Sequence, residues 1–283
     1  MLRNCCDKRM KFLLLVAVAA FTAQCQDNTL TPAERRAGFR LLFDGQSMRG
    51  WRDPATEKPP GDSWVISDGC LQTRPKPRIS EDLITKESFS DFELKFDWRV
   101  SPGGNTGVKY RIQRAVFIDD TKIRRGAGGF EAMLARELAE PRCDRASLAP
   151  GATGQEYTIA FEFQLLGDEG APATKEGLLH ATGALYSMLP PTAFAAHPAG
   201  QWNQSRMVLK GSHVEHWING VKVLDGSLSS EEARAGIAKR WAAAPAIRDM
   251  LLHPQPSGPI SLQHHGAAVW FKNLKIRTQR TKF

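Results

Sequence analysis

Hydrophobic and polar residues alternate along most of this chain, a pattern that predicts strands rather than helices. Between Phe92 and Val100 every second residue is hydrophobic, and the residues between them are charged. Such a segment forms a strand with one face in a core and the other outside it. The same alternation returns at 108–112, 214–218 and 269–274, so the chain should contain several antiparallel strands.

Turn and capping residues separate these strands. Asn219-Gly220 lies between two alternating runs and predicts a two-residue hairpin. Thr31-Pro32-Ala33-Glu34 is a capping box that should begin a short helix ending near Gly38, and Ser229-Ser230-Glu231-Glu232 should begin a second helix that reaches Trp241. Many short strands with few helices predict an all-β sandwich.

The alternation fails between Gln113 and Glu156, where several arginines and a glycine cluster gather. A long connection without a regular pattern is usually functional or inserted. We therefore predict a surface insertion at about 113–156 that overhangs the site, with local helix around Phe130 to Leu138.

The N-terminus has the pattern of an export signal. Four basic residues precede an apolar run from Phe12 to Ala23, which is too short to span a membrane. Thr22-Ala23-Gln24-Cys25 resembles a lipobox, which would make Cys25 a lipidated first residue, and cleavage after Val18-Ala19-Ala20 is the alternative. We expect residues 1–24 to be a signal peptide, residues 25–37 a linker with a short helix, and the remainder to 280 one exported domain.

Composition and charge narrow the function classes. The 283 residues are 42% hydrophobic and 24% charged, enough for a sizeable core. The net charge of +8 becomes +5 without residues 1–24, and the remaining basic side chains lie in the insertion or alternate with acids on strands, so nucleic acid is not an expected partner. Only Cys70 and Cys143 lie in the body, so one disulfide is possible and a disulfide scaffold is not.

The segment IAFEFQLLGD carries the first candidate site residues. Glu162 and Gln164 should point to one face while their hydrophobic neighbours fill the core, and a carboxylate beside an amide suits acid/base chemistry and substrate positioning. Asp168 has the same parity, although Gly167 can bend the chain before it. The alternative is that these are solvated polar positions on a half-exposed strand.

Further candidates come from three other segments. In GGNTGVKYRI, Lys109 and Arg111 should share a strand face, as site cations or in cross-strand salt bridges to Glu93 or Asp97. Of two adjacent histidines, His265 should share a face with Gln263, and the pair cannot chelate one metal because adjacent strand residues face opposite sides. Tyr186 and Trp202 could stack on a sugar ring. No GxGxxG, P-loop, HExxH or GxSxG motif occurs, which argues against nucleotide chemistry, zinc proteolysis and serine hydrolysis.

Several of these segments together resemble the 3-keto-disaccharide hydrolase family. They occur in the family's order from Gly38 to Ile276 and read GFRLLFDGQSMRGW, DFELKFDWRVSPGGNTGVKYRI, FEFQLLGD, GALY, GQWNQSRMVLKGSHVEHWING and GPISLQHHGAAVWFKNLKI. The resemblance implies a concanavalin A-like jelly roll of two antiparallel sheets with a carbohydrate groove. Its members look like periplasmic or lipid-anchored enzymes that act on glycosides already oxidised at C3 by a partner sugar 3-dehydrogenase.

The resemblance also implies roles for individual residues. Glu162 and Gln164 match the family's Glu-x-Gln, whereas Asp168 stands one residue beyond the usual acid position. His265 matches the histidine of its LQ-x-HG motif, and Arg111 the arginine that ends GVKYR.

A ketone at C3 acidifies the C2 proton, so a base can remove it and the resulting enolate can expel the C1 oxygen before water adds back. In this chemistry Glu162 and His265 are base and acid in either order. Arg111 or a divalent cation stabilises the enolate, and Asn105 and Gln164 position the sugar. No other cofactor is expected. The alternatives are a carbohydrate-binding module without catalysis and, less favoured because no second clear carboxylate accompanies Glu162, a conventional two-carboxylate hydrolase.

Overall fold

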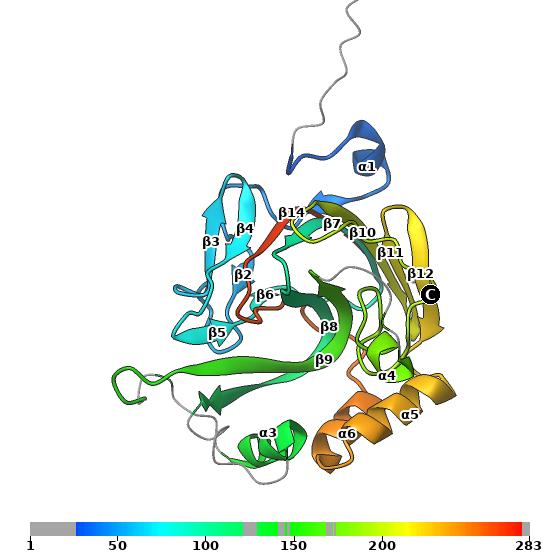
Figure 1. Cartoon of the computed structure of the whole chain (residues 1–283). Helices are drawn as coiled ribbons and strands as arrows, with labels where there is room; N and C mark the ends of the chain where they lie inside the picture. The colour runs from blue at the N-terminus through cyan, green and yellow to red at the C-terminus, as the bar shows by residue number, and fades with distance from the viewer. Residues whose placement is uncertain are drawn as a thin grey trace, which may run out of the picture.

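The structure is a computed structural model of the chain, in which residues 27–120, 129–140, 145, 148–167, 172 and 174–278 are described. Two β-sheets lie one above the other, and three helices cover the outer side of one of them (Figure 1). The predicted fold class, a jelly-roll sandwich of two mainly antiparallel sheets with a few short helices, is confirmed.

The larger sheet, which we call sheet A, has eight strands in the order β12-β11-β10-β7-β14-β4-β3, with β1 also paired to β14. Their bounds are β1 Arg40–Leu41, β3 Trp64–Ser67, β4 Cys70–Thr73, β7 Phe92–Val100, β10 Asn203–Lys210, β11 His213–Ile218, β12 Val221–Ser227 and β14 Val269–Thr278. The predicted strand at 92–100 is β7, the neighbour of β10 and β14. The predicted hairpin joins β11 to β12, with φ of 49° at Asn219 and 83° at Gly220.

The smaller sheet, sheet B, has the order β2-β6-β13-β8-β9-β5. Its strands are β2 Trp51–Arg52, β5 Ile79–Glu81, β6 Leu83–Thr85, β8 Asn105–Asp119, β9 Gly154–Leu166 and β13 Ser261–Leu262. β5 pairs with β9 in parallel, and the other pairings in sheet B are antiparallel. The long strands β8 and β9 form the floor on which the candidate site is built.

The irregular insertion is shorter than the sequence suggested. β8 continues to Asp119 and β9 begins at Gly154, so the prediction that regular structure fails from Gln113 to Glu156 is wrong at both ends. The cause is a bulge in β8: the register with β9 shifts between Tyr110 and Arg114, and Arg111 has a φ of 51°. Three residues of β8, 111–113, lie opposite the single residue 160 of β9, so the period-two alternation is interrupted there and the rest of the strand is hidden from a period-two reading.

Five helices are described: α1 Pro32–Arg36, α3 Gly129–Ala139, α4 Lys175–Leu178, α5 Glu231–Arg240 and α6 Pro245–Leu252. Both predicted caps are confirmed, since Thr31 forms a capping box at α1 and Ser230 caps α5. α3 confirms the helix predicted around Phe130 to Leu138. α6 was not predicted, and it has no side-chain cap hydrogen bond that could have marked its start.

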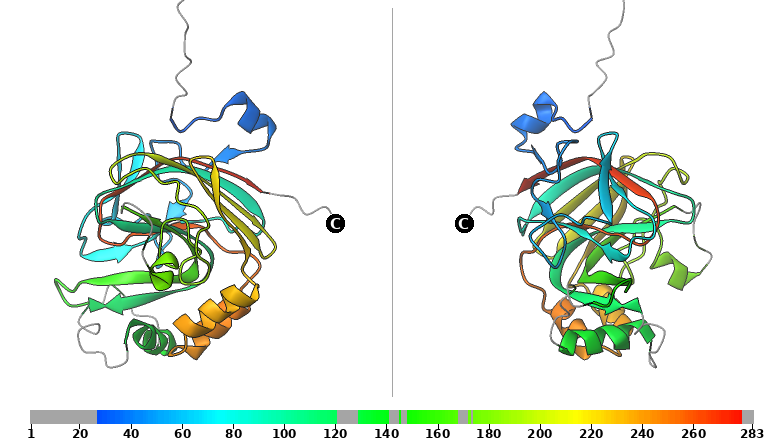
Figure 2. Two further views of the ribbon diagram at one scale, coloured as in Figure 1. Left: turned by 45° about the vertical axis from the view of Figure 1, so that its right-hand side comes forward. Right: turned by 90° about the vertical axis from the view of Figure 1, so that its left-hand side faces the viewer.

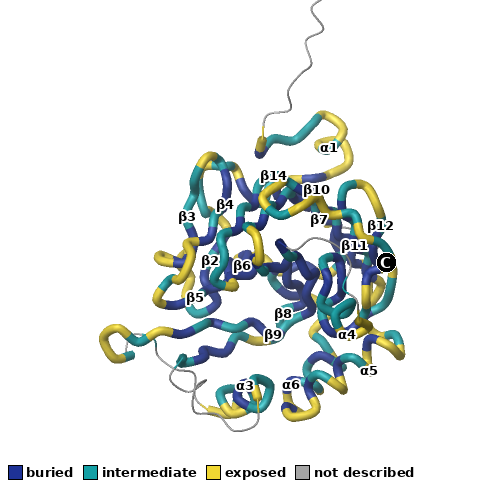
Figure 3. Tube along the Cα trace, in the orientation of Figure 1, coloured by how far each residue is buried: buried dark blue, intermediate teal, exposed yellow. Residues whose placement is uncertain are grey.

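The core lies between the sheets. Trp51, Trp64 and Trp98 are buried, and the rings of Phe96 in β7 and Phe163 in β9 meet edge to face with centroids 6.0 Å apart. Figure 3 shows buried backbone running along β8 and β9, beneath a more exposed outer layer of helices. β8 and β9 are therefore held between the core and the helices.

The first described residues attach to the outer side of sheet A. The backbone N–H of Asn28 donates to Asn273 Oδ1 over 2.6 Å, and the N–H of Asn273 donates back to Asn28 Oδ1 over 2.9 Å. Lys272 donates to Asp27 over 2.7 Å. Figures 1 and 2 place α1 on the side of sheet A opposite α3, α5 and α6.

Most residues on which the predicted export signal and disulfide depend are not among the described residues. Residues 1–24, Cys25 and Cys143 lie outside the described residues, and Cys70 is buried with a free thiol. In the described ranges, no helix is both long and apolar enough to cross a membrane.

Candidate functional site

A cavity of about 510 Å³ lies on the face of sheet B that points away from sheet A. This is within the range of about 300–1,000 Å³ typical of small-molecule sites. Its floor comes from β8, β9 and the segment after β13, and its walls come from α3, α4, α5 and the 179–187 segment. The predicted site residues that line it are Asn105, Glu162, Gln164, Tyr186, Gln263 and His265.

The pairing of β8 with β9 sets the floor of the cavity. Glu162 lies opposite Lys109, and Gln164 lies opposite Gly107, so the predicted shared face of Glu162 and Gln164 is confirmed. A Cβ at position 107 would lie 2.4 Å from Glu162 Oε1 and 2.7 Å from its Cγ. Gly107 therefore supplies the room that the carboxyl group of Glu162 occupies.

Burial sets the charge state of Glu162. Its side chain is within the cavity floor and the residue is 8% exposed. Burial raises the pKa of this carboxyl, and the positive charges of Lys109 and Arg240 offset part of that rise. Glu162 thus holds a proton more readily than an exposed glutamate does.

Amide side chains line the floor beside Glu162. Gln164 donates through Nε2 to Asn105 Oδ1 over 3.2 Å, and the backbone N–H of Gln263 donates to the carbonyl of Gly107 over 2.9 Å. The Oε1 atoms of Gln164 and Gln263 are buried and have no hydrogen-bond partner among the described residues. Because buried acceptors without partners are costly, these atoms are suited to hydroxyl groups of a bound ligand.

The two adjacent histidines point in different directions, as predicted. His264 is buried, and its Nε2 lies 2.9 Å from the carbonyl oxygen of Arg74. His265 lines the cavity. The residue remains partly exposed in the cavity, and desolvation lowers the pKa of its imidazole, a shift that a backbone hydrogen bond offsets in part and the charge of Lys109 increases. The neutral imidazole is therefore favoured.

Lys109 supports the floor from below and does not line the cavity. Its ammonium group donates to Asp82 over 2.9 Å, and both side chains are 1% exposed. Asp82 also accepts from Thr158 Oγ1 and from the backbone N–H of His264. The expected salt bridge of Lys109 therefore exists, but its partner is Asp82 rather than Glu93 or Asp97. A direct sugar contact by Lys109 does not fit this burial.

Arg111 lies away from the cavity. The bulge described above turns it out of the face that carries Lys109, so the expectation of a shared face is wrong. Its guanidinium donates to the carbonyls of Gln255 and Gly211, over 3.1 and 3.0 Å. Arg111 joins the end of β8 to neighbouring loops, and its predicted place beside the substrate does not fit the structure.

Two other predicted residues are not part of the described cavity. Asp168 lies outside the described residues. Trp202 lines a separate hollow of about 930 Å³ between the outer face of sheet A and the segment that contains Asp27 and Glu34. The cations of Lys272 and Arg99 lie over its ring, 4.5 and 5.0 Å from the centroid. The Trp202 ring therefore packs against two cations outside the site cavity, and its predicted stacking on a sugar in that cavity does not fit the structure.

The wall of the cavity contains residues that sequence reasoning missed. Arg240, the last residue of α5, donates to Ser187 Oγ over 2.7 Å and to the Tyr157 hydroxyl over 3.4 Å. Its guanidinium lies over the ring of Tyr186, 4.5 Å from the centroid. His180 Nε2 lies 3.0 Å from Ser187 Oγ. The sequence did predict a helix that ends near Arg240. It did not indicate that this end of the helix lies at the cavity.

The rim of the cavity joins three helices. Phe130 of α3 contacts Tyr157 edge to face with centroids 5.4 Å apart, so the insertion does overhang the site. Lys239 of α5 donates to Glu176 of α4 over 2.7 Å. Glu131 and Glu176 line the cavity together with Glu162, so the expectation that no second carboxylate accompanies Glu162 is wrong.

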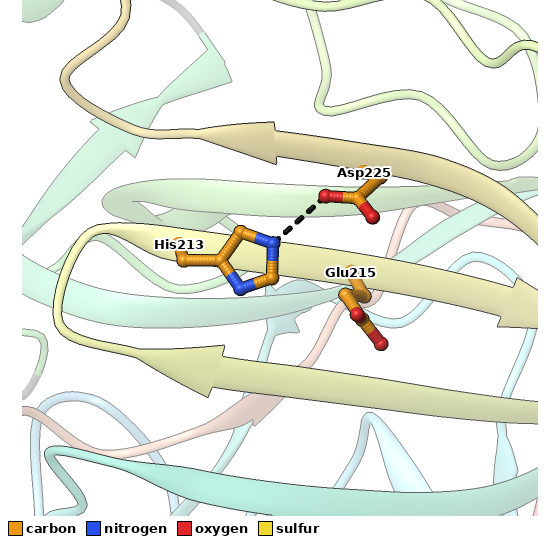
Figure 4. A group of neighbouring side chains, drawn as sticks. All are labelled: His213, Glu215 and Asp225. Atoms are coloured by element: carbon orange, nitrogen blue, oxygen red, sulfur yellow. Dashed lines mark hydrogen bonds and ion pairs between the residues drawn. The ribbon is translucent and has the colours of Figure 1, made fainter.

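One group of side chains has the composition of a metal site, but it lies on sheet A. His213, Glu215 and Asp225 bring their ligand atoms within 4.8 Å of one another on β11 and β12 (Figure 4). Lys222 pairs with both carboxylates, and Arg206 lies 3.8 Å from Glu215. These cations already neutralise the acids, so the cluster is explained as a surface ion-pair network.

The cavity has the parts needed for proton transfer on a polyhydroxylated ligand. A carboxyl that tends to keep its proton and an imidazole that tends to stay neutral line one cavity, with free amide acceptors beside them. Both shifts favour the uncharged form of the group, a protonated carboxyl at Glu162 and a neutral imidazole at His265.

Comparison with known proteins agrees with this chemistry. A family model described as the 3-keto-alpha-glucoside-1,2-lyase-like domain matches residues 38–277. The 3-keto-disaccharide hydrolase of Bacteroides thetaiotaomicron is 27% identical over 254 residues, which cover 85% of this chain and 78% of that protein.

Two crystal structures from Parabacteroides distasonis, both described as putative glycosyl hydrolases, are also similar. One has a TM-score of 0.63 and 26% identity, and covers 90% of this chain and 100% of its own. The other has a TM-score of 0.55 and 19% identity over 85% and 99% of the two chains, and supports the fold alone.

Proposed function

This chain belongs to the 3-keto-alpha-glucoside-1,2-lyase-like family of carbohydrate-active enzymes, and we propose that it cleaves 3-keto-glycosides, including 3-keto-disaccharides, by elimination followed by hydration. The observation that carries the proposal is the meeting of Glu162 and His265 in one cavity, with pKa values shifted in opposite directions. Because a protonated carboxyl can give a proton and a neutral imidazole can take one, we assign His265 as the base and Glu162 as the acid.

The proposed reaction begins at C2 of the oxidised sugar. His265 removes the C2 proton, and the electron pair of that bond forms an enolate with its charge on the C3 oxygen. The ketone then re-forms as the C1–O bond breaks, and Glu162 gives its proton to the leaving oxygen. Water then adds across the resulting C1–C2 double bond: Glu162 takes a proton from water as its hydroxyl adds to C1, and His265 returns a proton to C2, which completes a net hydrolysis and restores both groups.

The amides position the sugar for this reaction. The unpaired Oε1 atoms of Gln164 and Gln263 accept hydrogen bonds from hydroxyl groups, and Asn105 is fixed by Gln164. Tyr186 offers an aromatic edge at the wall, although its ring face is shared with Arg240. Hydrogen bonds from these amides would hold the substrate with its C2 hydrogen near the proposed base, His265.

The substrate must be supplied by another reaction. A glycoside acquires a ketone at C3 only by oxidation of its hydroxyl, so the functional partner is a sugar 3-dehydrogenase. The parent glycoside lacks an acidic C2 proton and should not react.

The decisive experiment compares a 3-keto-disaccharide with its unoxidised parent in D₂O, with purified protein. We expect sugar release and deuterium incorporation at C2 for the keto compound alone. Each reaction is run with a chelator and with added Mn²⁺ or Ca²⁺, because a divalent cation could also stabilise the enolate. Failure of both release and exchange under all conditions would disprove the elimination. Cleavage of the parent would favour a conventional glycosidase that uses Glu162 with Glu131.

A carbohydrate-binding module without catalysis is the second candidate, because the amide acceptors suit sugar binding whether or not chemistry follows. For such a module, Glu162→Gln would change affinity and there would be no turnover to lose. Calorimetric titration of parent disaccharide, run beside the turnover assay, separates the two.

We further propose that the chain is exported to the periplasm, where Cys25 carries a lipid anchor if the lipobox is used. Expression of the full chain and of its Cys25→Ser variant, followed by membrane fractionation and intact-mass measurement, tests both steps. A soluble periplasmic product with cleavage after Ala20 would support the alternative signal. Retention of residues 1–24 in the cytoplasm would overturn export.

A further inference from the structure

The proposed elimination needs a positive charge or strong donor at the C3 oxygen, where negative charge develops. Most of the described cations in or near the cavity already bind other groups of the protein. Arg111 is bound to loop carbonyls outside the cavity, Lys109 is paired with Asp82, and Lys239 is paired with Glu176. Arg240 is the cation that lines the cavity without a carboxylate partner in the described part of the chain.

Arg240 retains donor capacity after its contacts are counted. A guanidinium group has five N–H donors. Arg240 uses Nη1 toward Ser187 and Nη2 toward Tyr157, while its Nε is buried and has no hydrogen-bond partner in the described residues. Because a buried donor without a partner costs free energy, the site is better satisfied when a ligand oxygen accepts from it.

The surroundings hold Arg240 in one orientation. Its guanidinium lies over the rings of Tyr186 and Trp241, at 4.5 and 4.9 Å from the centroids. It also stands at the C-terminal end of α5, where a positive charge is favoured by the helix dipole. A cation fixed before the reaction stabilises developing charge without reorganising.

The same surroundings connect Arg240 to Glu162. The backbone N–H of Tyr186 donates to the carbonyl of Glu162 over 3.0 Å. One turn before Arg240, Gly236 lets α5 approach the 187–188 backbone, since a Cβ there would lie 2.7 Å from the carbonyl oxygen of Ser187. The cation and the carboxyl therefore belong to one rigid assembly.

We propose that Arg240 is a catalytic residue that donates to the C3 oxygen of the 3-keto sugar and stabilises the enolate. The inference rests on the proposed function. When His265 removes the C2 proton, the electron pair moves into the C2–C3 bond and the charge appears on the oxygen at Arg240. When the C1–O bond breaks, the electron pair of the enolate forms the C1–C2 double bond, the leaving oxygen takes the C1–O pair and the proton of Glu162, and Arg240 holds a neutral ketone again. Arg240 stays protonated throughout, because an arginine guanidinium is not deprotonated in proteins.

The test uses Arg240→Met, which keeps the aliphatic stem over the aromatic rings and removes the charge. The control is Arg234→Ala, which removes an exposed cation from the same helix without touching the cavity. We expect Arg240→Met to lose about 10²–10³-fold in kcat for both C2 exchange and sugar release, with a smaller change in KM. Added guanidinium should restore part of the rate to this variant and leave the control unaffected. A folded Arg240→Met that exchanges C2 hydrogen within about threefold of the unsubstituted protein would overturn the proposal.

A binding measurement separates this inference from the proposed function. Ascorbate carries a stable enolate oxygen on a small oxygenated ring and serves as the probe in an NMR titration. If the unsubstituted protein does not turn over the keto sugar, the proposed function fails, and ascorbate still tests the cation. Tighter ascorbate binding by the unsubstituted protein than by Arg240→Met, with equal binding of the neutral parent disaccharide, would support Arg240 as the enolate receptor. Equal ascorbate binding would count against it.

Discussion

The outer faces of the two sheets carry similar polar side chains and use them differently. On sheet A the charged groups pair with one another: Glu93 accepts from Arg206 over 2.6 Å and from Arg277 over 2.8 Å. The candidate metal group of Figure 4 belongs to the same network, because Lys222 neutralises its acids. On sheet B the polar groups of the floor keep unused hydrogen-bonding capacity at Gln164 and Gln263.

The comparison indicates what distinguishes a site from a polar surface. Residue type does not, since acids, cations and a histidine occur on both faces. The difference is cover: α3, α5 and the 179–187 segment enclose the face of sheet B, so Glu162, Gln164 and Gln263 on its floor are buried and their state depends on few neighbours. On sheet A, His213, Lys222 and Asp225 are exposed and have solvent as an alternative partner.

The largest effect is expected from Glu162→Gln, matched with Glu215→Gln on sheet A. Removal of the acid should lower kcat for 3-keto-disaccharide cleavage by about 10³-fold, while the Glu215 variant should retain the original rate. Initial rates of sugar release measure both. Equal losses would show that the two faces do not differ in function.

A large loss of stability is expected from Lys109→Met, matched with Lys222→Met. The first leaves the buried carboxylate of Asp82 without its ion pair and should cost about 3–5 kcal/mol in the free energy of unfolding. The second breaks pairs that are well exposed and should cost at most about 1 kcal/mol. Urea unfolding followed by fluorescence gives both values. Partial recovery in the double variant Asp82→Asn, Lys109→Met would attribute the loss to the unpaired charge.

A smaller effect on activity is expected from Gly107→Ala. The new methyl group overlaps the Glu162 side chain and should displace its carboxyl, with a loss of about 10–100-fold in kcat. Gly61→Ala is the control, because no atom lies within 4 Å of a Cβ there. In the background of Glu162→Gln, Gly107→Ala should have much less effect on rate, and full additivity would contradict the steric explanation.

The smallest effect concerns the pH profile of kcat/KM. His265 must be neutral to act as base, and its pKa is lowered, so the acidic limb should lie below the ordinary histidine value of about 6.5. Glu162 must be protonated to act as acid, and its pKa is raised, so the alkaline limb should lie above the ordinary carboxyl value of about 4.3. Glu162→Gln should remove the alkaline limb and His265→Gln the acidic limb. The opposite result would reverse their roles.

Local signals carried much of the fold. The alternation of 92–100, the capping box at Thr31 and the Asn219-Gly220 turn each depend on neighbours in sequence, and each appears in the structure. The convergence of Glu162 with Gln164 followed from strand parity for the same reason.

Features that depend on contacts between residues distant in the sequence could not be predicted from it. The positive φ at Arg111 has no local glycine to announce it, so the interruption of the alternation at residues 111–113 was not foreseen and Arg111 was expected in the wrong place. Arg240 enters the cavity because α5 packs against the 187–188 backbone, a contact between residues about 50 positions apart in sequence. No periodic pattern encodes such a contact.

The attachment of Asp27 and Asn28 to β14 has a mechanical consequence. β14 is an inner strand of sheet A, bonded to β7 on one side and to β4 on the other. A force that pulls on the chain at Asp27 is therefore taken up by the interior of sheet A and must cross the core before it reaches α5 or the 179–187 segment. The chain can be held by this end while the cavity, on the far side of the sandwich, carries no load.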